Sequence, residues 1–336
     1  MRRAGRGAAL IAAPLPADAE VRGDRVRAPG ARGGAVIYVH GGGFTDTMPE
    51  DERLMAYRLS KATGRPALRV DYRLAPTHPC PAALEDVLAA WRGVLDEGVP
   101  ASQIVLVGES AGATWVLSAL LEIARAGGPR PGAAVAVSPI TDFALTGASL
   151  SADDGKDVLS HAVLGSIADR YLAGADAQEA PQSPLYGELR GLPPLLIAVG
   201  TDEMLLDDAR RFAEAADAAG VSVRLEEYEY MPHGFHLSER GEVLLDRIGR
   251  WLADPVREFT VSDPDAGPYA LAHGPDGALG FTEWGRGGVG RITTDGRITT
   301  YDLPRSDSEP HGIVQHDCAL WCALETGSLA RIEVLR

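Results

Sequence analysis

The chain has 336 residues, 45% of them hydrophobic, and a formal net charge of −15 at pH 7. This charge argues against nucleic acid as a partner, because phosphates require a basic face. No run of 18 apolar residues occurs, so we expect neither a membrane span nor a membrane partner.

The number and spacing of the cysteines indicate the cellular compartment in which the protein is expected. The three cysteines, Cys80, Cys318 and Cys322, have neither a disulfide framework nor a zinc-ligand spacing, which favours the reducing cytoplasm. Residues 1–20 contain arginines and a short apolar patch that resembles a signal peptide, but two prolines interrupt the patch. We therefore expect a cytoplasmic protein.

The first half of the chain alternates apolar runs with helical patterns. Residues 21–28 are a first candidate strand, and Ala35–His40 (AVIYVH) predicts a buried one. The next candidates are a helix at 51–63, a strand at 66–70 and a helix at 82–98. Apolar strands in such alternation are typical of a mostly parallel sheet covered on both faces, and the length leaves room for an appendage.

The segment His40-Gly41-Gly42-Gly43 follows the strand that ends at His40. Glycines can bring bare backbone N–H groups close to a ligand where a Cβ would block the approach. After a strand, this pattern is typical of an oxyanion loop. The alternative is a flexible glycine turn.

The functional prediction depends on IVLVGESAG, residues 104–112. Four apolar residues run straight into Gly108-Glu109-Ser110-Ala111-Gly112, and a helix-compatible stretch follows. A strand turning sharply into a helix is the context in which G-x-S-x-G indicates a nucleophile, here Ser110. The glycines Gly108 and Gly112 leave the turn free of side chains. The alternative is a chance match in a chain with 39 glycines.

The second half of this region contains a long insertion. After a strand at 133–138, about fifty residues, 141–192, break the rhythm with one predicted helix at 159–172, and we expect a lid. The remaining elements, in order, are a strand at 195–199, a helix through 219, a strand at 221–230 and a helix at about 239–253, which closes the domain near 255.

A Ser-Asp-His order completes the predicted site. Asp202 and His233 each lie just past a predicted strand, as Ser110 does, and parallel strands present these ends on one edge. His233 is the expected base, and Asp202 would hold its tautomer. The expected donors to the substrate oxygen are the N–H groups of Gly41, Gly42 and Ala111.

Other residues compete for these roles. Glu203, Asp207 and Asp208 are alternative acids, although the last two fall inside a predicted helix. His236 is an alternative base. We expect structural roles for the others: Glu109 as a supporting carboxylate, and His40, His78 and His161 as histidines without the strand-end context of a base.

Several motifs occur in register: HGGGF at 40–44, DYRLAPTHPCPAALED at 71–86, GESAG at 108–112, TDE at 201–203 and HGF at 233–235. Together they resemble the hormone-sensitive-lipase-like esterases, bacterial family IV. Within this family, the stretches SPITDFALTGASL, SPLYGELRGLPPLLIAVGTDEMLLDDA and MPHGF resemble the branch of monoterpene ε-lactone hydrolases. The resemblance covers about residues 15–254. It implies an α/β-hydrolase fold with a helical cap, hydrolysis of small esters or lactones, and no metal or organic cofactor. The loop at residue 40 arrives early, which implies a reduced N-terminal cap; Ala113 replaces the usual Gly, and Glu203 replaces a common Pro.

Residues 256–336 have a different character. A repeat of 42 residues, from Pro268 to Pro310, with short alternating strands predicts propeller blades. The segment resembles virginiamycin B (streptogramin) lyase, and Glu309, His311 and Glu325 match its catalytic and metal-associated positions. Fewer than two full blades cannot close a ring, so we expect a remnant that docks on the hydrolase or is partly disordered, with ring completion by a homo-oligomer as the alternative. Magnesium is implied only if this tail is an active lyase.

Together these patterns predict a serine carboxylesterase or lactonase that acts on small, apolar acyl groups. Two alternatives stay open. One is a non-catalytic, ligand-binding relative of the family, and the other is an additional lyase activity in the tail.

Overall fold

The structure is a computed structural model that describes residues 12–14, 22–151, 155–238, 240–253, 259–261, 263–293 and 296–333. The chain divides into two compact units, Met1–Arg257 and Glu258–Arg336, which are described separately. The boundary predicted near residue 255 and most of the signal-like start lie outside the described residues.

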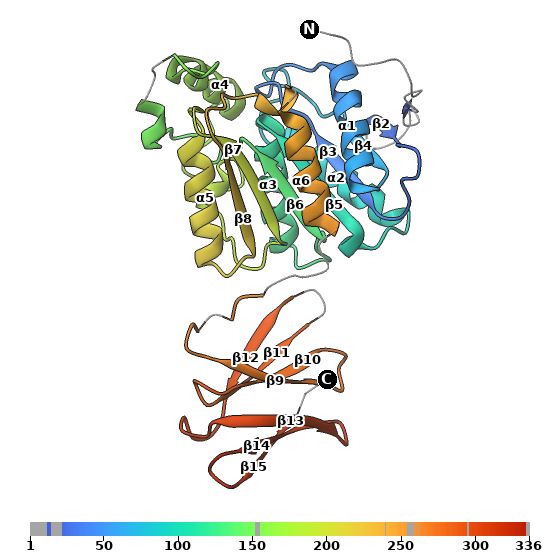
Figure 1. Cartoon of the computed structure of the whole chain (residues 1–336). Helices are drawn as coiled ribbons and strands as arrows, with labels where there is room; N and C mark the ends of the chain where they lie inside the picture. Colours follow the sequence, from blue (N-terminus) through green and yellow to red (C-terminus); the bar gives the residue numbers. More distant parts are fainter. Residues whose placement is uncertain are drawn as a thin grey trace. The chain divides into compact units, whose positions relative to one another are not determined.

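Among the described residues, eight strands form the central sheet of the first unit, in the order β1-β2-β4-β3-β5-β6-β7-β8 (Figure 1). Strands β1 and β2 are antiparallel at one edge, and all pairs from β4 to β8 are parallel. The predicted, mostly parallel sheet is confirmed. The strands are β1 (Ala12–Pro14), β2 (Gly23–Val26), β3 (Ala35–Val39), β4 (Ala67–Val70), β5 (Ile104–Glu109), β6 (Ala133–Val137), β7 (Leu195–Gly200) and β8 (Val223–Tyr228).

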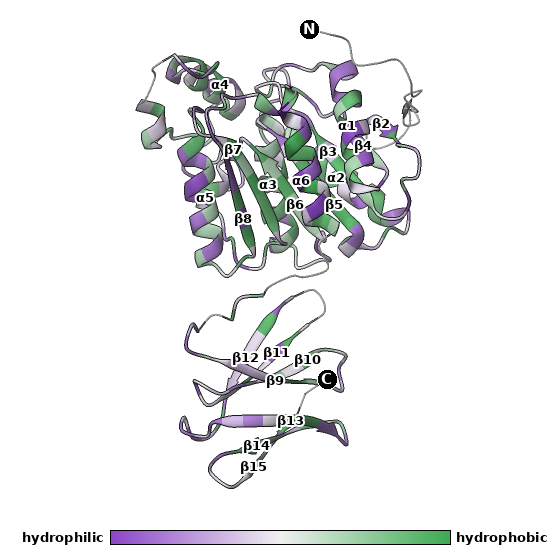
Figure 2. Ribbon diagram, in the orientation of Figure 1, coloured by the Kyte–Doolittle hydropathy of each residue, from purple (hydrophilic) through white to green (hydrophobic). Residues whose placement is uncertain are grey.

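Helices cover both faces of this sheet, because successive strand residues point to opposite sides. Ile37 belongs to the core under α2, α3 and α5, whereas its neighbour Tyr38 belongs to the core under α1 and α6. Figure 2 shows hydrophobic strands at the centre and hydrophilic residues on α5 and α6. The helices are α1 (Pro49–Thr63), α2 (Ala82–Asp96), α3 (Ala111–Arg125), α4 (His161–Leu172), α5 (Leu206–Ala218) and α6 (Gly241–Ala253).

The predicted insertion lies between β6 and β7. It contains short 3₁₀ turns at Ala148–Ser151 and Pro184–Tyr186 and the helix α4. Helix α4 begins at His161, two residues later than predicted, because the hydroxyl of Ser160 accepts the N–H of Val163 as an N-cap.

The second unit consists of two antiparallel sheets. Four strands pair in the order β12-β11-β10-β9, and three in the order β13-β14-β15. The repeat is visible in the structure, since Pro268 begins β9 and Pro310 begins β13, but the described sheets do not close into a propeller. The strands are β9 (Pro268–His273), β10 (Leu279–Glu283), β11 (Gly288–Ile292), β12 (Ile298–Asp302), β13 (Pro310–His316), β14 (Ala319–Leu324) and β15 (Leu329–Glu333).

Candidate active site

Ser110 stands at the apex of a strained turn between β5 and α3. Its φ of 51° is positive, which costs a non-glycine residue about 1–3 kcal/mol. A Cβ on Gly108 would overlap the carbonyl of Gly112, and a Cβ on Gly112 would overlap the carbonyl of Val39. Both glycines of G-x-S-x-G are therefore sterically required, and the tight turn holds the Ser110 hydroxyl above the sheet edge.

Ser110 is hydrogen-bonded to a histidine and, through it, to a carboxylate. Nε2 of His233 lies 2.9 Å from Oγ of Ser110, and its Nδ1 lies 2.9 Å from Oε2 of Glu203. Residues 110, 203 and 233 follow the carboxyl ends of β5, β7 and β8, which meet at one edge of the sheet. The structure thus brings together the predicted nucleophile and the predicted base.

The acidic partner differs from the prediction, which was wrong in choosing Asp202 for this contact. The turn after β7 folds back at Glu203, whose N–H donates to the carbonyl of Gly200, and it directs the Glu203 side chain inward. Asp202 is only half-buried and donates its own N–H to the carbonyl of Met231. Sequence alone offered two adjacent acids, and the turn decides between them.

The Glu203 carboxylate is fully enclosed and held in place. Its Oε1 accepts the hydroxyl of Ser138, at 2.8 Å, and the N–H of Gly200, at 2.7 Å. The His233 side chain is mostly buried, with 11% of it exposed. Burial alone would lower the pKa of His233, but the hydrogen bond and charge of Glu203, with smaller contributions from Asp157 and Glu109, raise it above its ordinary value. The site therefore stabilises an imidazolium.

The glycine loop after β3 lies directly beside Ser110. A Cβ on Gly41 would come within 3.3 Å of the Cβ of Ser110, and Gly42 has a φ of 106° with no room for a Cβ. The N–H of Gly41 donates to Oε1 of Glu109, at 3.4 Å, so the prediction that it faces the substrate needs correction. The N–H groups of Gly42, Gly43 and Ala111 have no hydrogen-bond partner among the described residues.

His40, the first residue of the glycine loop, holds this loop in place through contacts with Tyr72 and Gly41. The hydroxyl of Tyr72 donates to the carbonyl of His40, at 2.8 Å, and the two rings stack with centroids 4.3 Å apart. Nδ1 of His40 lies 2.7 Å from the carbonyl oxygen of Gly41. His40 is buried and supports the loop, as expected for a structural histidine.

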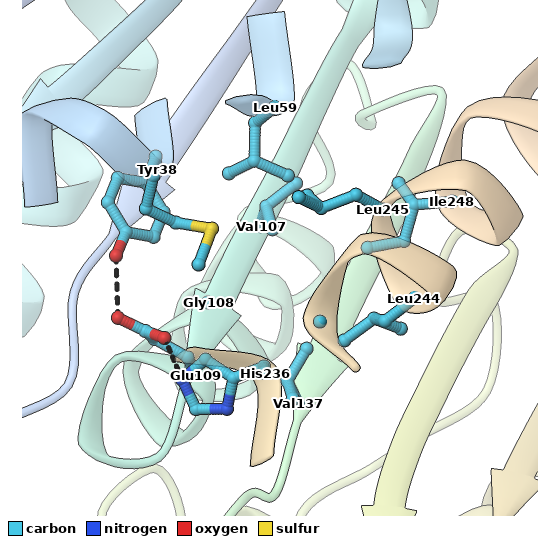
Figure 3. A pocket seen from close by; sticks show the side chains of 12 residues that line it. Tyr38, Leu59, Val107, Gly108, Glu109, Val137, His236, Leu244, Leu245 and Ile248 are labelled. Carbon is cyan, nitrogen blue, oxygen red and sulfur yellow. Dashed lines mark hydrogen bonds and ion pairs between the residues drawn. The ribbon is translucent and has the colours of Figure 1, made fainter. Parts of the chain in front are cut away.

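Glu109, the second residue of the G-x-S-x-G motif, joins three segments around the site (Figure 3). Its carboxylate accepts the hydroxyl of Tyr38, at 2.6 Å, and forms an ion pair with Nε2 of His236. Burial alone would raise the pKa of Glu109, but the charge and hydrogen bonds of its partners lower it to about 2. His236 is thus occupied by Glu109, and His233 is the histidine at Ser110.

A cavity of about 730 Å³ opens over the pair Ser110 and His233. Apolar side chains of the insertion, among them Ile140 and Ile167, line it together with the glycine loop. At its mouth, three hydrophobic side chains are more than half exposed: Met48, Val158 and Leu237. The cavity can hold an apolar acyl group next to a nucleophile.

The remaining candidate acids and histidines lie elsewhere. Asp207 accepts the N–H of Ser149, and Asp208 accepts the N–H groups of two residues that begin the insertion, Thr141 and Asp142. Burial raises the pKa of Asp208 to about 7. These carboxylates hold the insertion onto α5. The histidines His78 and His161 are exposed and are not among the residues lining the cavity.

In the second unit, the three tail candidates come together. Nε2 of His311 lies 2.7 Å from Oε1 of Glu325, and a hydrogen bond with Glu325 raises the pKa of Glu309. Tyr269 packs edge-on to His311 with centroids 5.4 Å apart. Among the residues that the structure describes, no three His, Cys, Asp or Glu side chains gather so as to hold a metal ion.

No helix in the described part of the chain has both the length and the apolar character needed to cross a membrane.

The sequence matches two families. The first, described as alpha/beta hydrolase fold, matches residues 36–237, and the second, the virginiamycin B lyase family, matches residues 231–332. An acetyl-hydrolase of Streptomyces hygroscopicus is 42% identical over 205 residues, which cover 61% of this chain and 69% of the relative. An esterase of Acinetobacter venetianus is 33% identical over 221 residues, covering 65% of this chain and 73% of the relative.

Solved structures similar to this chain are also esterases. The crystal structure of an esterase from the bacterial hormone-sensitive lipase family is 39% identical, with a TM-score of 0.70 over 72% of this chain and 84% of that one. An esterase/lipase from an uncultured bacterium is 37% identical, with a TM-score of 0.70 over 73% of this chain and 84% of that one. These relatives are named as esterases, lipases and acetyl-hydrolases, so hydrolysis of lactones stays a prediction.

Proposed function

The chain belongs to the alpha/beta hydrolase fold family, and from this premise we propose that it is a serine carboxylesterase whose reaction is carried by Ser110, His233 and Glu203. The similarity to esterases and acetyl-hydrolases makes the chain a carboxylester hydrolase. The contact between Ser110 and His233, at 2.9 Å, is the observation that carries the assignment of residues.

The proposed reaction has two halves. Nε2 of His233 removes the proton of the Ser110 hydroxyl as its Oγ attacks the ester carbonyl, and the imidazolium then protonates the departing alcohol. In the second half, His233 removes a proton from water, the hydroxide attacks the acyl-enzyme, and the acid leaves as Ser110 regains its proton. Glu203 fixes the Nδ1–H tautomer of His233 and stabilises the imidazolium in both halves.

The oxygen that becomes negative needs fixed donors. We assign this role to the N–H groups of Gly42, Gly43 and Ala111, since the two glycines line the same cavity as Ser110, Ala111 follows it in the chain, and all three N–H groups are free of other partners in the described chain. Ala111 also begins α3, whose N-terminal end favours negative charge. Each such donor is worth about 3–4 kcal/mol of the barrier in a hydrolase with this chemistry.

The cavity supports a small, apolar acyl group. Ile140 and Ile167 line the cavity, and Ile167 lies against the glycine loop, since a Cβ on Gly43 would lie 3.5 Å from its side chain. A cavity of about 730 Å³ with this lining supports a short acyl chain beside Ser110. Lactones of similar size remain candidate substrates because the attacked group is the same.

A labelling experiment tests the proposal. An organophosphate should modify one serine per chain, at Ser110, and the variant Ser110→Ala should neither be labelled nor hydrolyse p-nitrophenyl butyrate. The matched control is Ser118→Ala, because Ser118 lies on the same helix and donates to the carbonyl of Pro181, away from the site. Absence of labelling in the wild type would favour the non-catalytic, ligand-binding alternative, and activity retained by Ser110→Ala would refute the assignment.

We do not propose a second, lyase activity for the tail. The contact of His311 with Glu325 and the family match favour such a site. However, the residues described there do not assemble a metal-ligand group, and the two sheets do not form the closed ring of a propeller. No step is therefore assigned to magnesium.

A further inference from the structure

We propose that Asp157, in the insertion between β6 and β7, is a positioning residue that holds the turn containing Glu203 and the turn containing His233 at a fixed separation. The inference rests on the proposed function and adds a residue to it.

The contacts of Asp157 reach both turns at once. Its Oδ1 accepts the backbone N–H of His233, at 2.8 Å, and its Oδ2 accepts the backbone N–H of Met204, at 2.7 Å. Met204 directly follows Glu203. One carboxylate thus joins the turn after β7 to the turn after β8, although it belongs to neither.

The two hydrogen bonds of Asp157 bear on the distances between the proposed reacting side chains. The His233 ring must reach Ser110 and Glu203 simultaneously, and both contacts are 2.9 Å. A displacement of about 1 Å in such an arrangement can cost on the order of 100-fold in rate. Because Asp157 fixes the main chain of His233 and of the residue after Glu203, it controls the separation on which both contacts depend.

The same carboxylate connects the site to the wall of the cavity. The N–H of Val158 donates to Oδ1 of Asp157, at 2.7 Å, and Val158 and Leu159 line the cavity over Ser110. Through Asp157, the cavity-lining residues Val158 and Leu159 are therefore linked to the turns that contain Glu203 and His233. Loss of the anchor should affect substrate binding as well as turnover.

Asp157 also acts on the charge of His233. The groups that face this ring are Glu203, Asp157 and Glu109, and each negative charge favours the imidazolium. Replacing Asp157 by a neutral residue should lower the pKa of His233. The acid limb of kcat/KM, which reports protonation of the base, should then move to lower pH.

The test compares Asp157→Asn with Asp176→Asn in the full chain. Asp176 lies in the same insertion and is exposed, and among the described residues its carboxylate accepts a local N–H, that of Gln178, at 2.8 Å. With p-nitrophenyl butyrate we expect Asp157→Asn to lower kcat about 10- to 100-fold, raise KM and shift the acid limb to lower pH. Asp176→Asn should match the wild type in all three.

A second variant separates charge from geometry. Asp157→Glu keeps the negative charge on a longer arm, so its acid limb should stay at the wild-type pH while kcat falls. This variant also decides the matter if Asp157→Asn does not fold, as judged by circular dichroism and thermal unfolding. The inference would be overturned if both variants kept the wild-type kcat. It would also be overturned if kcat fell in Asp157→Asn while the acid limb of that variant stayed at the wild-type pH.

The outcome is separable from that of the proposed function. If the wild type hydrolyses the ester and Ser110→Ala does not, the proposed function holds whatever Asp157→Asn does. If Ser110→Ala retains activity, the proposed function fails before the variants of Asp157 are considered.

Discussion

Oε2 of Glu203 lies 2.9 Å from Nδ1 of His233, while the adjacent Asp202 is turned away and half-exposed. Two neighbouring acids in one turn therefore have different environments. The variants of these two residues form a matched pair.

Glu203→Gln should lower kcat by about 10³- to 10⁴-fold, because an amide favours the wrong tautomer of the base and cannot stabilise the imidazolium. Asp202→Asn should keep kcat within about twofold of the wild type. Steady-state kinetics with p-nitrophenyl butyrate measures both. A large loss in Asp202→Asn with an active Glu203→Gln would return the acidic role to Asp202.

The pH dependence of the reaction should follow His233. Its carboxylate neighbours raise the pKa of His233 above the ordinary 6.5, although burial acts in the opposite direction. The base must be neutral to accept the proton of Ser110, so kcat/KM should fall as the pH drops through this raised pKa. A pH profile with a midpoint below 6.5, at pH values where the protein stays folded, would contradict the geometry.

The ion pair of Glu109 with His236 should contribute to stability in a pH-dependent way. The pKa of Glu109 is lowered to about 2 from 4.5, so its contribution is present above about pH 4.5 and is lost as the pH falls toward 2. A lowering of this size corresponds to about 3 kcal/mol. Urea unfolding should show that Glu109→Gln is less stable than the wild type at pH 7, with a difference that shrinks by more than half at pH 3.

Acyl-chain length should separate good substrates from poor ones. Ile140 and Ile167 line the cavity over Ser110, and we expect them to bound the acyl site, so p-nitrophenyl butyrate should be cleaved faster than the palmitate ester. The ratio of kcat/KM values for the two esters is the measurement, taken in detergent-free buffer with the wild type. Faster cleavage of palmitate would mean that the insertion does not bound the acyl site.

The second unit should add no lyase activity to the chain. With Mg²⁺ present, the full-length protein is expected to leave a cyclic depsipeptide of the streptogramin B class intact, as followed by mass spectrometry. Ser110→Ala serves as the background, so that ester hydrolysis by the first unit cannot open the ring. Magnesium-dependent opening that is lost in His311→Ala would overturn this expectation.

The sequence by itself determined the fold class and the strand-turn-helix segment that presents Ser110, the predicted nucleophile. Apolar runs alternating with helical patterns predicted the parallel sheet, since strands covered on both faces must be apolar throughout. The motif around Ser110 was equally informative, because a Cβ at position 108 or 112 would overlap backbone atoms and glycine is therefore required at both positions. This requirement can be recognised from five consecutive residues. Such features depend on neighbours along the chain.

Only the tertiary structure decided which groups meet across the chain. The choice between Asp202 and Glu203 depends on how the turn after β7 folds back, and the N–H of Gly41 turns toward a carboxylate from another strand, Glu109. Asp157 carries no recognisable motif, because its partners are backbone N–H groups of two distant turns. Backbone donors are the same in every residue, so a sequence cannot mark them, and only folding brings a carboxylate within their reach.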